Sequence, residues 1–130
     1  MTTPFWCLLV ACLIPYFIAP IGGYFRAKQF GSVDNKNPRI QAAGLVGVGS
    51  RAQAAQANAW EALPVFASAV LVAHLAGAHP GASSTAALVF IAARLGHAGF
   101  YLADVDKARS AIFLVGVGCC VWLFVLAARA

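Results

Sequence analysis

The chain has 130 residues, of which 62% are hydrophobic and only 10% are charged. Soluble domains carry about a quarter of their residues as charged side chains, so this composition excludes an ordinary soluble domain. The length has room for one domain, residues 1–130, and not for two. A net charge of +5 would suggest a nucleic-acid partner in a soluble protein, but here the placement of the charges explains it better.

Four apolar segments dominate the chain. Each is about 20 residues long, which is enough for a helix to cross the hydrocarbon core of a bilayer. Backbone groups in lipid must be paired within their own segment, so long apolar runs form helices there. The predicted spans are residues 3–24, 52–76, 83–102 and 108–128. We therefore expect an all-α integral membrane protein whose four transmembrane helices form an up-down bundle.

The first span has no charged residue and contains Pro15 and Pro20. Each proline removes one helix hydrogen bond, so we expect kinks at these positions, which neighbouring helices can compensate. The connection that follows, residues 30–41, is the one polar segment of the chain, and its Asp-Asn and Asn-Pro pairs favour turns. We expect this connection to lie along the membrane surface.

The second span opens with the stretch RAQAAQANAWEALPVF, residues 51–66, which is apolar apart from a few polar side chains. Asn58 lies seven residues after Arg51, and Glu61 lies three residues after Asn58. At 3.6 residues per turn, these offsets place all three side chains along one face of the helix. Burying them in an apolar helix is costly, so they require an explanation.

The third span repeats this spacing with Arg94, His97 and Tyr101, and the fourth span begins with Arg109 and Ser110. Both polar faces and the start of the fourth span fall at a common depth. The bland interpretation is a buried network, such as Glu61 paired with Arg94, that ties the helices together. Ionisable groups at this depth are rare and usually mark a site, so we favour a binding site.

Charge placement along the chain predicts the topology. Two loops that share one side of the membrane hold seven of the nine Lys and Arg residues, whereas the short loop at 76–84 holds none. By the positive-inside rule, both basic loops are cytoplasmic and both termini lie on the other side. In a bacterial inner membrane the termini would be periplasmic and the polar site would face the cytoplasm. The charge is therefore explained by topology, and no nucleic-acid partner is expected.

Other reactive side chains carry a weaker signal. His74 and His79 lie toward the opposite end, where a histidine is usually a satisfied interfacial residue. The four cysteines all fall in predicted spans and form no C-x-x-C pair, so we interpret them as small hydrophobic residues and expect no metal site. Glycines in the third and fourth spans, such as Gly96 and Gly99, predict close helix packing.

The polar residues also suggest the chemistry of a ligand. Because cations outnumber Glu61, the ligand should be anionic overall, and it should carry an amine or another donor for this carboxylate. Arginine favours planar carboxylates because its fork donates two parallel hydrogen bonds. A small zwitterionic peptide with extra carboxylates fits these demands, although the residue types alone do not name it.

The motif R-A-x(5)-N-x-x-E-x-L-P-x-F at residues 51–66 and the motif A-R-x-x-H-x-x-x-Y at residues 93–101 are followed by Arg109-Ser110. Together they resemble the MAPEG family, the membrane-associated proteins in eicosanoid and glutathione metabolism. The resemblance covers nearly the whole chain, and the DNKNPR loop looks most like the bacterial branch. It implies a homotrimer of four-helix subunits in the lipid bilayer, with glutathione as co-substrate bound between subunits near the cytosol.

The resemblance also implies roles for single residues. The implied glutathione contacts are Arg51, Asn58, Glu61, Arg94, His97, Tyr101 and Arg109. Arg109 matches the arginine that steadies the glutathione thiolate, Ser110 matches the serine beside it, and Tyr101 is the remaining candidate for thiol activation. Two positions depart from the pattern: Ala54 stands where eukaryotic members commonly have an arginine, and Phe113 stands where they have a tyrosine.

Three functions remain open at this point. The first is a glutathione S-transferase for lipophilic electrophiles, with or without peroxidase activity toward lipid hydroperoxides. The second is a non-catalytic glutathione-binding or scaffolding membrane subunit, which Ala54 and Phe113 favour. The third is a small proton-coupled exporter, but such exporters need a carboxylate in the first span, which has none. We favour the transferase, and the generic apolar side chains leave its second substrate open.

Overall fold

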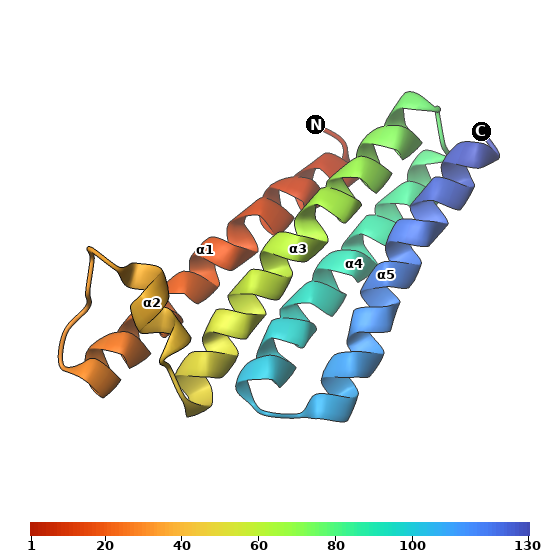
Figure 1. Cartoon of the computed structure of the whole chain (residues 1–130). Helices are drawn as coiled ribbons and strands as arrows, with labels where there is room; N and C mark the ends of the chain where they lie inside the picture. The colour runs from red at the N-terminus through yellow and green to blue at the C-terminus, as the bar shows by residue number, and fades with distance from the viewer.

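The structure is a computed structural model that describes all residues, 1–130, and contains only helices. The helices are α1 (Thr3–Phe30), α2 (Pro38–Ala43), α3 (Gly47–Leu75), α4 (Pro80–Leu102) and α5 (Asp106–Ala128). All except α2 are long and apolar enough to cross a membrane. The four long helices run alternately up and down, so both termini lie at the same end of the bundle (Figure 1). The predicted four-helix membrane bundle is therefore confirmed.

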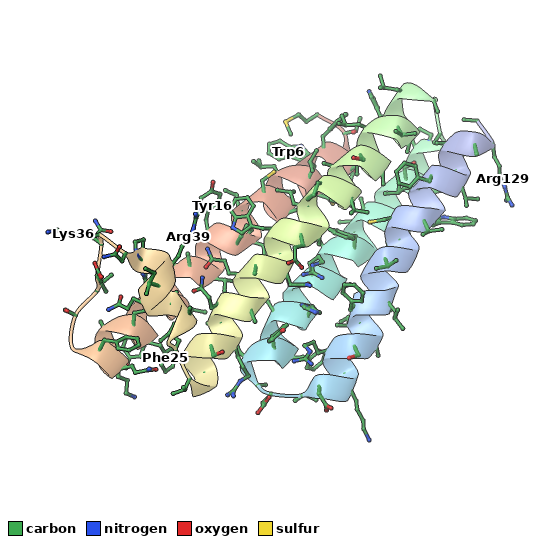
Figure 2. All side chains as sticks on the ribbon, viewed as in Figure 1. Trp6, Tyr16, Phe25, Lys36, Arg39 and Arg129 are labelled. Atoms are coloured by element: carbon green, nitrogen blue, oxygen red, sulfur yellow. The ribbon has the colours of Figure 1, made fainter.

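Two ends of the bundle can be distinguished. The terminal end carries both termini and the α3–α4 turn, and the loop end carries α2 and the α4–α5 loop (Figure 1). Figure 2 shows Lys36 on the polar connection at the loop end and Arg129 at the terminal end. Most of the basic residues of the chain lie at the loop end: Arg26, Lys28, Lys36, Arg39, Arg51, Lys107 and Arg109. The positive-inside rule still predicts that this end is cytoplasmic.

The helices α1 and α3 are longer than their apolar runs. They contain 28 and 29 residues, which corresponds to about 42–44 Å at 1.5 Å per residue and exceeds the ~30 Å hydrocarbon core. α1 continues without a break through Pro15 and Pro20 and on to Phe30. The sequence prediction ended the first span too early because hydropathy marks the bilayer and not the end of the helix.

The polar connection contains a helix that the sequence interpretation missed. Pro38 is the first residue of α2, where its fixed φ and missing N–H are tolerated. Before it, the Asp34 carboxylate accepts hydrogen bonds from the backbone N–H groups of Lys36 and Asn37, at 2.8 and 3.0 Å. Arg26 donates to the carbonyl of Pro38 and so holds α2 against α1. The predicted turns are present, and they lead into this short helix.

The apolar core is divided unequally between the two ends. Toward the terminal end, a cluster of thirteen buried residues includes the stacked rings of Phe66 and Phe90, whose centroids are 3.8 Å apart. Toward the loop end, the corresponding cluster has only four members, Ile14, Ile18, Ala55 and Ala59. The terminal half therefore supplies most of the packing that holds the helices together.

Glycine permits a close approach of helices at one of the predicted positions. A Cβ atom on Gly96 would lie 2.7 Å from Cδ1 of Ile112, so the absent side chain leaves room for this methyl group where α5 packs on α4. A Cβ on Gly99 would meet no atom within 4 Å. The close-packing prediction is confirmed for Gly96, whereas within one chain Gly99 does not serve this purpose.

Candidate functional site

A buried guanidinium forms the centre of the polar half of the bundle. Arg94 on α4 is only 5% exposed, and its Nη2 donates to Oδ1 of Asn58 at 2.6 Å. Nδ2 of Asn58 in turn donates to Oε2 of Glu61 at 3.5 Å. The i to i+3 spacing on α3 thus places both of its polar side chains on the same side, as expected from helical geometry.

Arg94 and Glu61 do not form the ion pair that the structural interpretation of the sequence suggested. The only salt bridge of the chain involves neither of them, and Asn58 lies between the two charges. A buried arginine without a carboxylate partner is costly, because its charge has left water without compensation. Arg94 therefore retains the capacity to bind an anion.

The three polar side chains line one pocket with a volume of about 200 Å³. Its lining residues come from α3, α4 and α5, and Figure 1 shows these three helices packed together. The apolar lining residues are Ala62, Val65, Phe90, Phe113, Gly116, Val117 and Cys120. Such a pocket suits a ligand that carries both polar and apolar groups.

A second cluster joins α4 to the start of α5. The guanidinium carbon of Arg109 lies over the ring of Tyr101, 4.4 Å from the ring centroid. The His97 ring meets Tyr101 edge-on at 5.5 Å and is 6.1 Å from the Phe113 ring. His97 is only 3% exposed, and its Nδ1 has no hydrogen-bond partner. Phe113 thus links this aromatic cluster to the pocket, which it also lines.

Arg109 lies in the first turn of α5, which begins at Asp106. The unpaired N–H groups and the dipole of a helix N-terminus attract anions, and a guanidinium at the same place adds a full positive charge. Ser110 follows it and is exposed, without a side-chain hydrogen bond. The start of α5 is therefore suited to stabilise a negative charge, and Arg109 is the side chain positioned to do so.

Arg51 lies apart from the other site residues. It is seven residues before Asn58, which is about 10 Å along α3. Its Nη1 is 3.4 Å from Oδ2 of Asp104, and its Nε donates to the carbonyl oxygen of Leu102 at 3.3 Å. The sequence interpretation did not consider Asp104, although an acidic residue directly after the third span is unusual enough to have been noticed.

Comparison with known protein families agrees with this fold. The family model of the MAPEG family matches residues 3–129. The chain belongs to the MAPEG family. No curated protein sequence matches it significantly. MAPEG members are membrane proteins of glutathione and eicosanoid metabolism, they include glutathione transferases and other enzymes, and they generally use glutathione.

Within this MAPEG chain, the residues singled out in the sequence fall into three places. Asn58, Glu61 and Arg94 share the pocket, whereas His97, Tyr101 and Arg109 form the adjacent aromatic and cationic cluster. Arg51 is bound to the α4–α5 loop, and Ser110 contacts none of the others through a hydrogen bond. The residues that sequence reasoning missed are Asp104 and the apolar lining of the pocket, because generic Val and Phe side chains give no signal.

Proposed function

We propose that this MAPEG protein is a membrane-embedded glutathione S-transferase, which joins the glutathione thiolate to lipophilic electrophiles. The observation that carries the proposal is the buried Arg94 guanidinium, which has no carboxylate partner and lies beside the Glu61 carboxylate in one pocket. Glutathione offers the complementary groups: two carboxylates for cations, one ammonium group for Glu61, and a thiol. A neutral or purely apolar ligand would leave Arg94 uncompensated.

Each polar residue of the pocket has a role in this proposal. Arg94 binds a carboxylate of glutathione through charge-assisted hydrogen bonds. Glu61 accepts hydrogen bonds from the ammonium group. Asn58 is hydrogen-bonded to Arg94 and to Glu61 and so fixes the orientation of these two side chains. His97 contributes its unpartnered Nδ1 as a further hydrogen-bonding group at the edge of the site.

The chemical step depends on the start of α5. A free thiol has a pKa of about 8.5, so only a small fraction is thiolate at neutral pH. The Arg109 guanidinium and the N-terminal dipole of α5 both favour the anion and would lower that pKa. Ser110 is proposed to donate a hydrogen bond beside it, and Tyr101 holds the guanidinium in place by a cation–π contact.

The apolar wall of the pocket provides access for the second substrate. A lipophilic electrophile that partitions into the bilayer can reach the thiolate between α3 and α5, and bond formation then releases a leaving group or opens a ring. A lipid hydroperoxide reaching the same thiolate would instead be reduced to the alcohol as its O–O bond breaks, and the thiolate would be oxidised to the sulfenate, which a second glutathione converts to the disulfide and water; this is the proposed peroxidase activity. We place this site in a homotrimer, in which surfaces such as the open face at Gly99 contact a second copy.

A non-catalytic glutathione-binding or scaffolding subunit is the second candidate. The observation that favours it is Phe113, which packs against His97 and lines the pocket with a ring that carries no hydroxyl group. Both candidates bind glutathione, but only the transferase converts it to a product.

The deciding experiment is glutathione-dependent turnover of a panel of electrophiles and hydroperoxides by the purified protein in detergent. The proposal expects turnover that Arg109→Ala largely removes, while the control Arg129→Ala at the terminal end retains it. Binding of glutathione without any turnover would support the non-catalytic subunit. Failure to bind glutathione at all would exclude both candidates.

A further inference from the structure

The end of α4 has the hydrogen-bond pattern of a Schellman motif. The N–H of Val105 donates to the carbonyl of Phe100 at 3.0 Å, and the N–H of Asp104 donates to the carbonyl of Tyr101 at 3.3 Å. Asp104 has a φ of +63° and is the only non-glycine residue of the chain with a positive φ. The residue at this place in the motif is usually glycine, because the left-handed conformation costs energy for a residue that carries a Cβ.

The end of α3 has the same motif with glycine, the usual residue, at the left-handed position. There Gly77 has a φ of +76°, and the same two hydrogen bonds connect Ala78 to Ala73 and Gly77 to His74. The two turns thus have the same backbone pattern and differ in the residue at the left-handed position. A glycine would serve the backbone at the end of α4 equally well, so the backbone alone does not require the carboxylate of Asp104.

The electrostatics of the helix end also disfavour this carboxylate. The last carbonyl groups of a helix carry partial negative charge, so an anion next to them is destabilised. Arg51 offsets the repulsion with two contacts: Nη1 lies 3.4 Å from the Asp104 carboxylate, and Nε donates to the Leu102 carbonyl. The pair is the only salt bridge of the chain, and it connects the start of α3 to the end of α4.

We propose that Asp104 is an internal competitor of the ligand, whose carboxylate occupies Arg51 until a carboxylate of glutathione replaces it. This inference rests on the proposed glutathione site, with the second carboxylate of glutathione reaching Arg51 about 10 Å along α3 from Asn58, and it adds a latch at that arginine. The Asp104 side chain is 67% exposed, and exposed ion pairs are weak, so a ligand carboxylate can displace it at little cost. Release of Asp104 frees the loop that leads directly into the first turn of α5, where Arg109 lies.

The test compares glutathione affinity, measured by isothermal titration in detergent, among three proteins. Asp104→Asn keeps the shape and tolerates the left-handed backbone but lacks the competing charge, so it should bind glutathione about three- to fivefold more tightly than wild type. Asp34→Asn is the control, because it removes an acidic charge from the same end of the bundle that does not contact Arg51, and it should leave affinity unchanged. Equal or weaker binding by Asp104→Asn would overturn the inference.

A glutathione diester separates competition from a general change in charge. With both ligand carboxylates blocked, Asp104→Asn and wild type should bind the ligand with equal affinity. If Asp104→Asn also tightens diester binding, the effect is not competition for Arg51, and the inference is wrong. Asp104→Gly serves as a second variant, since glycine suits the backbone position and the protein should fold at least as well.

Amide hydrogen exchange without ligand tests the latch on its own. Exchange across residues 103–109 should be faster in Asp104→Asn and Arg51→Gln than in wild type, and the double variant should be no faster than Arg51→Gln alone, because Arg51→Gln already removes both the ion pair and the hydrogen bond to Leu102. Unchanged exchange in both would show that no latch exists. If wild type binds no glutathione, both the proposed function and the latch are wrong. If wild type and Asp104→Asn bind glutathione equally, only the latch is wrong.

Discussion

The two halves of the bundle are built from the same four helices but bury different kinds of side chain. In the terminal half, the stacked rings of Phe66 and Phe90 are surrounded by buried apolar residues with no charge among them. In the loop half, Arg94 and His97 are buried beside a core cluster of only four residues. The terminal half provides most of the apolar packing, whereas the loop half buries polar groups beside a small core. Stability and binding should therefore respond to different substitutions.

The largest effect on stability is expected from Phe66→Ala. Phe66 is completely buried, and removal of a buried phenylalanine costs about 3–5 kcal/mol in free energy of unfolding. Unfolding by denaturing detergent, followed by circular dichroism, measures the loss, and Phe17→Ala on the exposed face of α1 is the control. The protein that remains folded should still bind glutathione, because Phe66 itself does not line the pocket. A specific loss of binding would contradict the division between the two halves.

Arg94→Met should have the opposite pattern. Loss of a hydrogen-bonded charge at the ligand should weaken glutathione binding about 10- to 100-fold. Stability should stay the same or rise, because the variant no longer buries an uncompensated charge. Titration calorimetry and detergent unfolding measure the two quantities, with Arg129→Met as the control. If the variant unfolds and its folded remainder binds normally, Arg94 is a structural residue and the proposed site is wrong.

A smaller effect is expected at Tyr101, whose ring lies under the Arg109 guanidinium. A cation–π contact at a partly exposed site contributes about 0.5–1 kcal/mol, so Tyr101→Leu should lower kcat/KM about two- to fivefold. Tyr101→Phe keeps the ring and should retain most of the activity. If Phe is as harmful as Leu, the hydroxyl group is the important part and Tyr101 acts on the thiol directly.

The smallest effect concerns the polar connection at the loop end. Hydrogen bonds from the backbone N–H groups of Asn37 and Lys36 hold the pKa of the Asp34 carboxyl below its ordinary value of 3.8. Because the pKa is depressed in the folded state, the ordering of this turn is present above pH 3.8 and is lost as pH falls through the lower, folded value. Amide exchange at these two positions should lose protection in that range, and Asp34→Asn should remove the pH dependence. A pH dependence that persists in the variant would assign the titration to another group.

A structural feature can be predicted from this sequence when residues close together in the chain determine it, and not when it depends on residues far apart in the chain. Helices and polar faces follow from local spacing, so the four spans and the common side of Asn58 and Glu61 were predictable. The partner of Arg94 depends on which side chain the packing of α3 on α4 brings within reach, and this turned out to be Asn58. The contact between Arg51 and Asp104 requires two helix ends 51 or more residues apart in sequence to meet, which local patterns do not encode.

The claim at the centre of the proposed function is that the start of α5 stabilises a thiolate. Its most direct measurement is the ultraviolet thiolate band of bound glutathione, titrated with pH in wild type, Arg109→Ala and the control Arg129→Ala. In wild type the bound thiol should titrate well below the free value of about 8.5. Arg109→Ala should move its pKa back toward 8.5, and the control should follow wild type. Identical curves for wild type and Arg109→Ala, both saturated with glutathione, would contradict the proposed role of Arg109.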